Sequence, residues 1–247
     1  QLTSLDLSVV PLLQSAACYK NNIVNFNPGI LPQMTYLNLS DNDIPGALDV
    51  SNSPNMLYLN VDGNPITSLN VNGLASLESL NARGTQLTTL DLSTHVGLKY
   101  AYFNYSLLTS LDLSHSPNLL ILECTGNDIV TLNVAGLTNL TELRCTENQI
   151  QTLDASSLSS LVVLQCTTNA LTGLNVAGLA NLEILECGQN PTIGSLDLSG
   201  LTGLKTLNVG FNDLVDIDLS GCPNLEYFSC FYNKFTTLNV SNLTHLQ

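Results

Sequence analysis

The chain has 247 residues, of which 44% are hydrophobic and 11% are charged, and its formal net charge is −14. Nucleic acid and anionic membrane surfaces are disfavoured as partners, because both are recognised through a basic footprint. No apolar run reaches the ~18 residues of a membrane span, and no basic-then-apolar signal peptide opens the chain. The charged fraction is below the ~25% of ordinary domains, as in a repeat protein whose every unit buries an aliphatic layer.

A period of about 21 residues runs from one end of the sequence to the other. One unit contains Leu143, then Cys145 two residues later, then Asn148, and the same types return one period later. A fixed period in this range is typical of a solenoid, in which each unit is one coil. From the N-terminus, the leucine column reads Ala16, Leu37, Leu59, Leu80, Ala101, Leu122, Leu143, Leu164, Leu185, Leu207 and Phe228. The sequence therefore predicts eleven coils, with half coils at Leu2–Asp6 and at Leu246.

Each coil is expected to begin with a short strand. Alternation such as Glu142-Leu143-Arg144-Cys145 turns every second side chain inward, and strands one coil apart stack in parallel about 4.8 Å apart. The asparagine then supplies donors and an acceptor to backbone groups of the turn. The return leg is too short for a long helix, so extended or 3₁₀ segments are expected there. Extra residues near Pro45–Gly46 and Pro191–Gly194 predict small bulges.

The pattern LxxLxCxxNxLxxLxVSxxxx resembles the 21-residue leucine-rich repeat of bacteria. The cysteine in the strand makes it most similar to internalin J and related surface proteins of Gram-positive bacteria and Bacteroidetes. The resemblance covers essentially the whole chain. It implies a single leucine-rich-repeat domain over residues 1–247, a piece of a longer protein, with a concave parallel sheet of about eleven strands. It also implies partner binding on the concave face, often in adhesion, and an extracellular or bacterial cell-surface location.

The seven cysteines are interpreted as free structural thiols. Six occupy the inward strand column, namely Cys18, Cys124, Cys145, Cys166, Cys187 and Cys230, and Cys222 lies outside it. Stacked parallel residues hold their Cβ atoms about 4.8 Å apart, whereas a disulfide requires a mean of about 3.8 Å. A linear column also cannot surround a metal ion tetrahedrally. We therefore expect a ladder of buried thiols that act as small hydrophobic residues.

A second polar column follows the return leg. It reads Asp6, Asn27, Asp49, Asn70, Asp91, Asp112, Asn133, Asp154, Asn175, Asp197, Asp218 and Asn239. These side chains are expected to bond to backbone groups of the return turn. Stacked carboxylates also make Ca²⁺ binding an alternative, although Ca²⁺ prefers more oxygen ligands than two carboxylates provide. No cofactor is otherwise predicted.

The sequence gives no indication of catalysis. The three histidines, His95, His115 and His245, fall in different columns, so none stands beside another in the stacked coils. Motifs for zinc proteases, serine hydrolases and phosphate-binding loops do not occur in the sequence. The chain is therefore predicted not to be an enzyme.

Function is expected where the outward strand positions depart from the repeat. All eight tyrosines fall on the strand side of the coil and none in the return leg. Tyrosine offers a large, rigid contact area at small entropic cost. The predicted binding residues on the concave face are Tyr36, Tyr58, Arg83, Tyr100, Tyr102, Asn104, Tyr105, Glu123, Glu142, Arg144, Tyr227 and Phe231.

The sequence therefore predicts a non-catalytic recognition or adhesion module that binds a protein or a glycan. The alternative is a structural spacer or self-assembly repeat of a larger surface protein or enzyme. In that alternative an exposed stripe of Ile121, Val163 and Ile184 would mediate homo-oligomerisation. Neither hypothesis includes nucleic acid or a membrane span.

Overall fold

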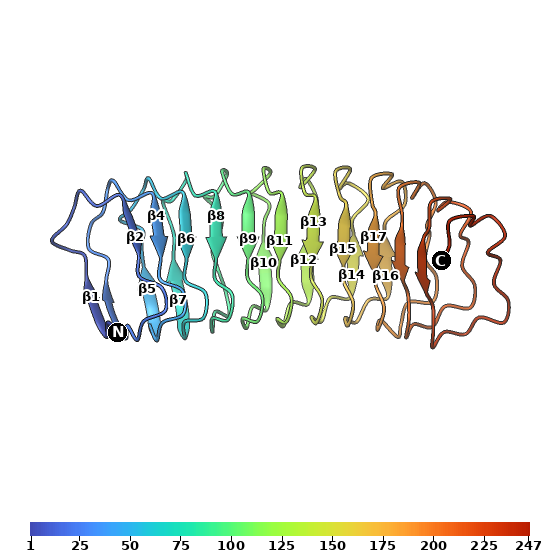
Figure 1. Cartoon of the computed structure of the whole chain (residues 1–247), viewed down its shortest axis with the longest axis horizontal. Helices are drawn as coiled ribbons and strands as arrows, with labels where there is room; N and C mark the ends of the chain where they lie inside the picture. Colours follow the sequence, from blue (N-terminus) through green and yellow to red (C-terminus); the bar gives the residue numbers. More distant parts are fainter. The chain divides into compact units, whose positions relative to one another are not determined.

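The computed structural model describes residues 1–247 (Figure 1). The chain divides into two compact units, Gln1–Leu119 and Leu120–Gln247, and each is described by itself. Both consist of short strands and turns without any helix, so no helix is present that could cross a bilayer. Each unit is a parallel-strand solenoid, which confirms the predicted fold class. The extent of the domain, 1–247, stays a prediction.

Five strands of the first unit form the column that begins each coil. They are β2 (Ser15–Ala17), β4 (Tyr36–Asn38), β6 (Tyr58–Asn60), β8 (Ser79–Asn81) and β9 (Tyr100–Tyr102). All pair in parallel, with Leu37 opposite Leu59 and Leu59 opposite Leu80. These offsets are the 22- and 21-residue spacings that the sequence predicts.

The second unit adds six strands of the same kind. They are β11 (Ile121–Glu123), β13 (Glu142–Arg144), β15 (Val163–Gln165), β17 (Ile184–Glu186), β18 (Thr206–Asn208) and β19 (Tyr227–Ser229). Leu143 lies opposite Leu122 on one side and Leu164 on the other. Five and six strands give the eleven predicted for the column.

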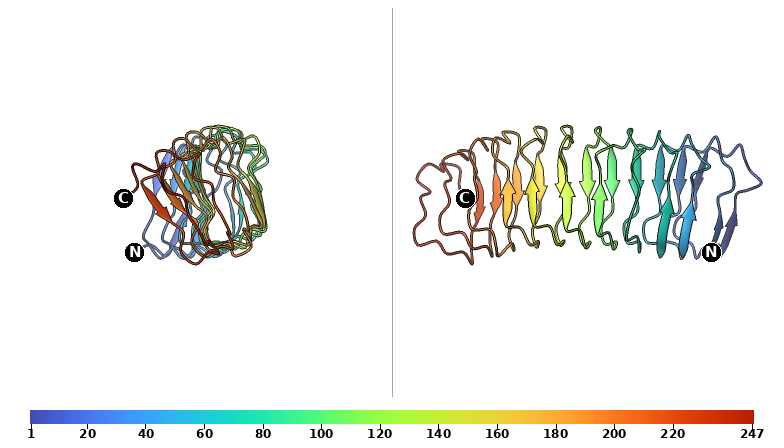
Figure 2. Two further views of the ribbon diagram at one scale, coloured as in Figure 1. Left: turned by 90° about the vertical axis from the view of Figure 1, so that its right-hand side faces the viewer. Right: turned by 180° about the vertical axis from the view of Figure 1, so that it is seen from behind.

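The return legs are extended, as predicted, and contain no 3₁₀ turn. Their strands in the first unit are β1 (Ser4–Asp6), β3 (Asn25–Asn27), β5 (Gly46–Asp49), β7 (Ile66–Asn70) and β10 (Ser110–Asp112). In the second unit they are β12 (Thr131–Asn133), β14 (Thr152–Asp154) and β16 (Gly173–Asn175). Figure 2 shows β5 and β7 from behind, pointing opposite to the column strands of their unit. The pairing of β5 with β7 shifts register between Gly46 and Ala47, which confirms a bulge at Pro45–Gly46.

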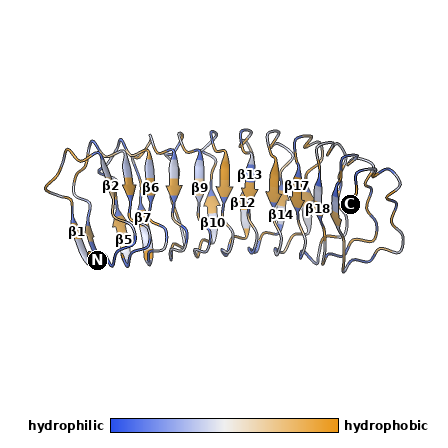
Figure 3. Ribbon diagram, viewed as in Figure 1, coloured by the Kyte–Doolittle hydropathy of each residue, from blue (hydrophilic) through white to orange (hydrophobic).

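The core lies between the two legs of each coil. From the second to the tenth coil the inward strand residues are buried while their neighbours face outward, and Figure 3 shows both hydrophobic and hydrophilic colours along the strands. In the fifth coil the inward pair is Ala101 and Phe103, and both side chains are completely inaccessible. A small residue beside a large one conserves core volume, as expected from the sequence.

The asparagine column closes the turn after each strand. Asn148 donates to the carbonyls of Cys145 and Thr146 in its own coil and to Cys124 in the preceding coil, at 2.9–3.2 Å. Its Oδ1 accepts the Ile129 N–H at 3.1 Å. One amide therefore joins two coils, which confirms the predicted role. Where Thr85 and Ser106 replace asparagine, hydroxyl groups take over and both donate to the Ala82 carbonyl.

The second polar column also has the structural role predicted for it. At all twelve positions of this column the Asp or Asn Oδ1 accepts the backbone N–H two residues later, at 2.9–3.4 Å. Wherever the column residue is Asp, the residue two positions later is a serine. Hydrogen bonds from that serine lower the pKa of the Asp carboxyl. Because the pKa is lowered by folding, this stabilisation exists above the ordinary carboxyl pKa of about 4 and is lost as the pH falls through the folded value.

A left-handed residue, which the repeat pattern did not reveal, follows each of the eleven column strands. Glycine fills three of these eleven positions, and other residues with φ of 52–57° fill eight. The column reads Lys20, Asp41, Gly63, Gly84, Tyr105, Gly126, Glu147, Thr168, Gln189, Phe211 and Tyr232. The three glycines at one repeat position were the available signal, since glycine adopts this conformation most readily.

All seven cysteines are free, as predicted. Cys124, Cys145, Cys166 and Cys187 are completely buried in successive coils. The expectation that all six column members are buried is wrong for Cys18 and Cys230, which are only half-buried. These two lie in the first and last coils, where fewer neighbouring coils cover them.

Candidate functional site

The strand face is the set of outward side chains from the start of each column strand to the left-handed residue that follows it. Every residue predicted to bind a partner lies on this face. The structure gathers them into three groups, one in the first unit and two in the second. Each group is described within its own unit.

The tyrosine patch of the first unit comprises Tyr36, Tyr58, Arg83, Tyr100 and Tyr102. The rings of Tyr36 and Tyr58 stack at 4.6 Å between centroids with an interplanar angle of 6°. Beside them, the amides of Asn38 and Asn60 donate to the two tyrosine hydroxyls at 3.5 and 3.3 Å. The register causes the stack, because Tyr36 lies opposite Tyr58 on adjacent parallel strands.

The second pair of the tyrosine patch is a cation–π contact. The Arg83 guanidinium lies 4.5 Å from the centroid of the Tyr102 ring. Such a contact holds a planar cation and an aromatic ring in a fixed relation. Tyr100 lies opposite Ser79, on the side of Ser79 that is away from the Tyr36–Tyr58 stack. The predicted residue Asn104 lies in the same turn as Tyr105, a residue that is 64% exposed.

Acidic groups lie along the edge of the tyrosine patch. Burial and the charge of Asp41 raise the pKa of the Asp62 carboxyl, while Arg83 opposes that rise. The patch therefore combines flat aromatic surfaces and amide groups with two carboxylates beside one guanidinium. These groups suit contact with a polar surface that also has apolar faces.

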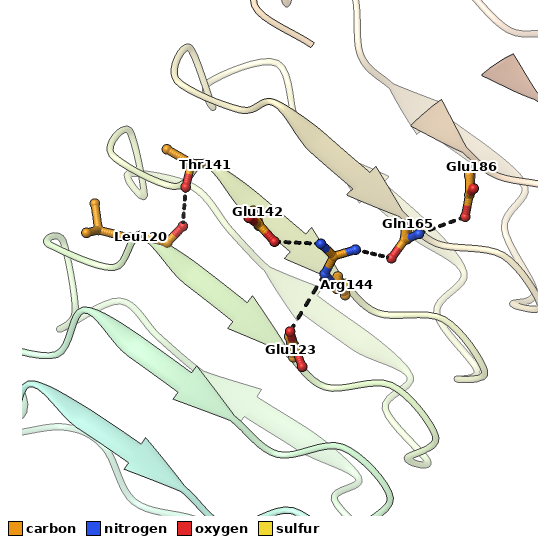
Figure 4. Close-up of polar contacts among 7 residues, drawn as sticks. All are labelled: Leu120, Glu123, Thr141, Glu142, Arg144, Gln165 and Glu186. Atoms are coloured by element: carbon orange, nitrogen blue, oxygen red, sulfur yellow. Dashed lines mark hydrogen bonds and ion pairs between the residues drawn. The ribbon is translucent and has the colours of Figure 1, made fainter. Parts of the chain in front are cut away.

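The charged network of the second unit centres on Arg144 (Figure 4). Its guanidinium contacts Glu142 at 2.6 Å and Glu123 at 3.7 Å, and it also donates to Gln165 Oε1. Gln165 in turn donates to Glu186 at 2.8 Å. Three carboxylates against one cation leave this surface negative. Because the ion pairs are partly exposed, they orient the side chains more than they stabilise the fold.

An aromatic cluster at the end of the second unit is the largest departure from the predicted site. Phe211 and Tyr232 stack at 4.6 Å with an interplanar angle of 8°, and Phe231 meets Phe211 edge-on at 5.0 Å. These three residues are 42–74% exposed. Of the three, only Phe231 was predicted, because Phe211 belongs to the left-handed column that the sequence analysis missed. The predicted Tyr227 is 56% exposed, on the strand that precedes Phe231.

The predicted apolar stripe is not exposed. Val163 is buried, and Ile121 and Ile184 are half-buried. Neighbouring side chains on the strand face cover them, as the parallel register places Glu142 opposite both Ile121 and Val163. The structure therefore contradicts an exposed stripe for self-assembly.

Solved structures show what the chain is similar to. The functional domain of InlJ from Listeria monocytogenes, described as including a cysteine ladder, is 29% identical, with a TM-score of 0.80 over 99% of this chain and 59% of that chain. The leucine-rich-repeat protein LIC12759 from Leptospira interrogans is 22% identical, with a TM-score of 0.68 over 92% of this chain and 69% of that one. An internalin, inlF, from Listeria monocytogenes is 22% identical, with a TM-score of 0.60 over 95% and 86%.

The fold is a leucine-rich repeat with a cysteine ladder. No protein-family model matches the chain, and neither does any curated protein. The leucine-rich repeat here spans 59% of the internalin J chain it resembles. In the ladder of this leucine-rich repeat, burial raises the pKa of the Cys145 and Cys187 thiols to about 12. A protonated, inaccessible thiol is a poor nucleophile, so these residues act in packing.

Thiol labelling should divide the six column cysteines of the leucine-rich repeat into two classes. In the native protein, Cys18 and Cys230 are expected to react within minutes, because both are partly exposed. Cys124, Cys145, Cys166 and Cys187 are expected to react only on unfolding. Mass spectrometry of peptides after timed alkylation measures this difference. Rapid native labelling of the four buried thiols would contradict the structure.

Proposed function

We propose that the chain is a non-catalytic recognition module that binds a protein or a glycan through its strand face. The observation that carries this proposal is the paired arrangement of the tyrosine patch. Tyr36 stacks on Tyr58, and Arg83 lies over Tyr102, so these four side chains are held in place before any partner arrives. Preorganised side chains lose little entropy on binding.

The distribution of aromatic residues supports the same face. All eight tyrosines lie on the strand face, and none lies on a return leg. Tyrosine and arginine are enriched among residues that dominate binding energy in interfaces. A general preference of aromatic residues for strands would also have placed tyrosines on the return-leg strands.

The charge of the chain favours some partners over others. One similar solved structure is a complex of TLR13 with ssRNA13, and another is the PEPR1–AtPEP1 complex, so the fold alone does not select the partner class. Here the net charge is −14, and the charged network is negative. A phosphate backbone would be repelled. The function that we propose is therefore binding of a protein or a glycan, at a bacterial surface or outside the cell.

Alanine substitutions in the tyrosine patch test the proposal. A variant with Tyr58→Ala, Tyr100→Ala and Tyr102→Ala should bind a ligand found by glycan-array or cell-binding screening at least about 30-fold more weakly, since truncating central interface residues costs about 2 kcal/mol or more. Titration of ligand with purified protein measures the loss, and thermal unfolding checks that the fold persists.

The matched control changes Val130 and Val215 to alanine, because both are exposed in turns of the return side. Its affinity should equal that of the parent chain. A third variant with Phe211→Ala and Tyr232→Ala probes the aromatic cluster separately. Unchanged affinity in the tyrosine variant would refute the tyrosine patch as the site, whichever result the aromatic-cluster variant gives.

A further inference from the structure

The return legs of the first and second coils are separated, although both contain strands. β3 pairs with β1, and β5 pairs with β7, but β3 and β5 do not pair with each other. No Cα atom of β3 lies within 8 Å of a Cα atom of β5. In the second unit, by contrast, the successive return strands β12 and β14 approach within 8 Å, and β14 pairs with β16.

The extra residue of the second coil accounts for this separation. It lies at Pro45–Gly46, where proline has no N–H to donate and Gly46 adopts a φ of 71°. The two legs are nevertheless fixed at both ends of the gap. Asp43 N–H donates to the Ile23 carbonyl at 3.1 Å, and Leu31 N–H donates to the Asn52 carbonyl at 3.3 Å. The gap is therefore a fixed feature of the first unit.

A cleft occupies this gap. Two adjoining cavities of about 420 and 410 Å³ share Phe26, Asn27, Ala47 and Leu48 in their linings. Leu48 is buried beneath the cleft and Phe26 is half-buried, so the floor is apolar. Asp6 lines the first cavity and Asp49 lines the second, and both carboxyl pKa values are lowered by hydrogen bonds from serine. The rim is therefore negatively charged at neutral pH.

We propose that the gap between β3 and β5 binds an extended peptide strand that pairs with the open edges of both. Each of these strands has one edge without a neighbouring strand, and such edges readily accept another chain. One inserted strand needs two strand spacings, about 9.6 Å, and this agrees with a separation of more than 8 Å.

The lining specifies the chemistry of the peptide. Alternate side chains of an extended strand point to opposite faces, so one set enters the apolar floor at Phe26 and Leu48. The other set faces the acidic rim at Asp6 and Asp49, where lysine or arginine is complementary in charge. The occupant is therefore an extended segment in which aliphatic residues alternate with basic ones. This site lies on the return legs and does not depend on the function proposed for the strand face.

A synthetic peptide tests the site directly. The probe is an eight-residue peptide of alternating valine and lysine, and its control has N-methylated valines, which cannot donate backbone hydrogen bonds. Hydrogen exchange of the intact chain should slow across residues 24–30 and 44–50 with the probe, and not with the control. Absent protection in those residues, or equal binding of the methylated peptide, would overturn the proposal.

Two variants separate the apolar and charged contributions. Phe26→Ala should weaken binding of the peptide about tenfold, because it removes the aromatic side chain from the floor of the cleft. Asp49→Asn should weaken it about two- to fivefold, because one exposed charge is lost. Asparagine keeps the turn, as Asn70 does one coil later. The matched control Asp112→Asn changes the same column outside the gap and should bind like the parent chain.

The tyrosine-patch variant distinguishes this site from the strand face. If that variant no longer binds the peptide, the peptide binds to the strand face. This result would overturn the proposal that the peptide binds in the gap between β3 and β5. Sedimentation of the parent chain and of the Phe26→Ala variant is the last measurement. The two proteins are expected to have the same oligomeric state. A dimer that Phe26→Ala dissociates would assign the gap to a second copy of the chain and would equally overturn the proposal.

Discussion

Replacing Asn190 with alanine is expected to lower the free energy of unfolding by about 3–5 kcal/mol. Asn190 is completely buried, and its amide donates to the carbonyls of Cys166, Cys187 and Gly188 at 3.0–3.2 Å. Its Oδ1 also accepts the Leu171 N–H at 3.1 Å. Alanine leaves these backbone groups without partners in a site that water does not reach. Chemical denaturation measures the loss.

Two further variants act as controls for Asn190→Ala. Asn148→Ala makes the same kind of change at a half-buried position, where water replaces part of the lost bonding, so a smaller loss is expected. Asn190→Ser should recover part of the stability, because Ser106 fills the same column naturally. A loss below about 1 kcal/mol for Asn190→Ala would contradict the inter-coil role of this side chain.

The second large effect is expected at Phe103. Its side chain is completely buried, so Phe103→Ala should cost about 3–5 kcal/mol through lost apolar contact and the cavity left behind. Ala101 lies in the same coil and is also inaccessible. Adding Ala101→Leu to Phe103→Ala should therefore restore a large part of the loss, since the pair then returns to the leucine pattern of the other coils.

The single variant Ala101→Leu completes this double-mutant cycle. With Phe103 in place there is no room for the larger side chain, and overpacking should cost about 1–3 kcal/mol. The two changes are thus each destabilising alone and compensating together, which denaturation of the four proteins measures. Additive losses would show that the two side chains do not share one volume.

Most of the fold could be predicted because each structural role recurs at a fixed repeat position. The columns of Leu143, Cys145, Asn148 and Asp154 each fill one geometric role, so the spacing alone determines strand register and turn bonding. Burial near the ends was harder to predict. Cys230 has the same repeat position as Cys187, but it has fewer coils above it and is only half-buried.

The site was less predictable, because its groups depend on contacts between side chains in different rows. The stack of Tyr36 on Tyr58 follows from the register, and these residues were predicted. The stack of Phe211 on Tyr232 needs the left-handed turn, which no pattern of apolar residues reveals. Likewise, the separation of β3 from β5 depends on which side of the leg the extra residue bulges, and the sequence shows only that a residue is added.

The left-handed column has a consequence for how this scaffold can diverge. A residue with a Cβ atom in that conformation is disfavoured by about 1–2 kcal/mol, whereas glycine is not. Gly63, Gly84 and Gly126 show that glycine is accommodated there, yet Tyr105, Phe211 and Tyr232 place aromatic rings at the same position. Those coils therefore carry a conformational cost that glycine would avoid, which is expected where the displayed ring takes part in binding. In related chains, the choice between glycine and a large side chain at this position should distinguish coils that only maintain the scaffold from coils that meet a partner.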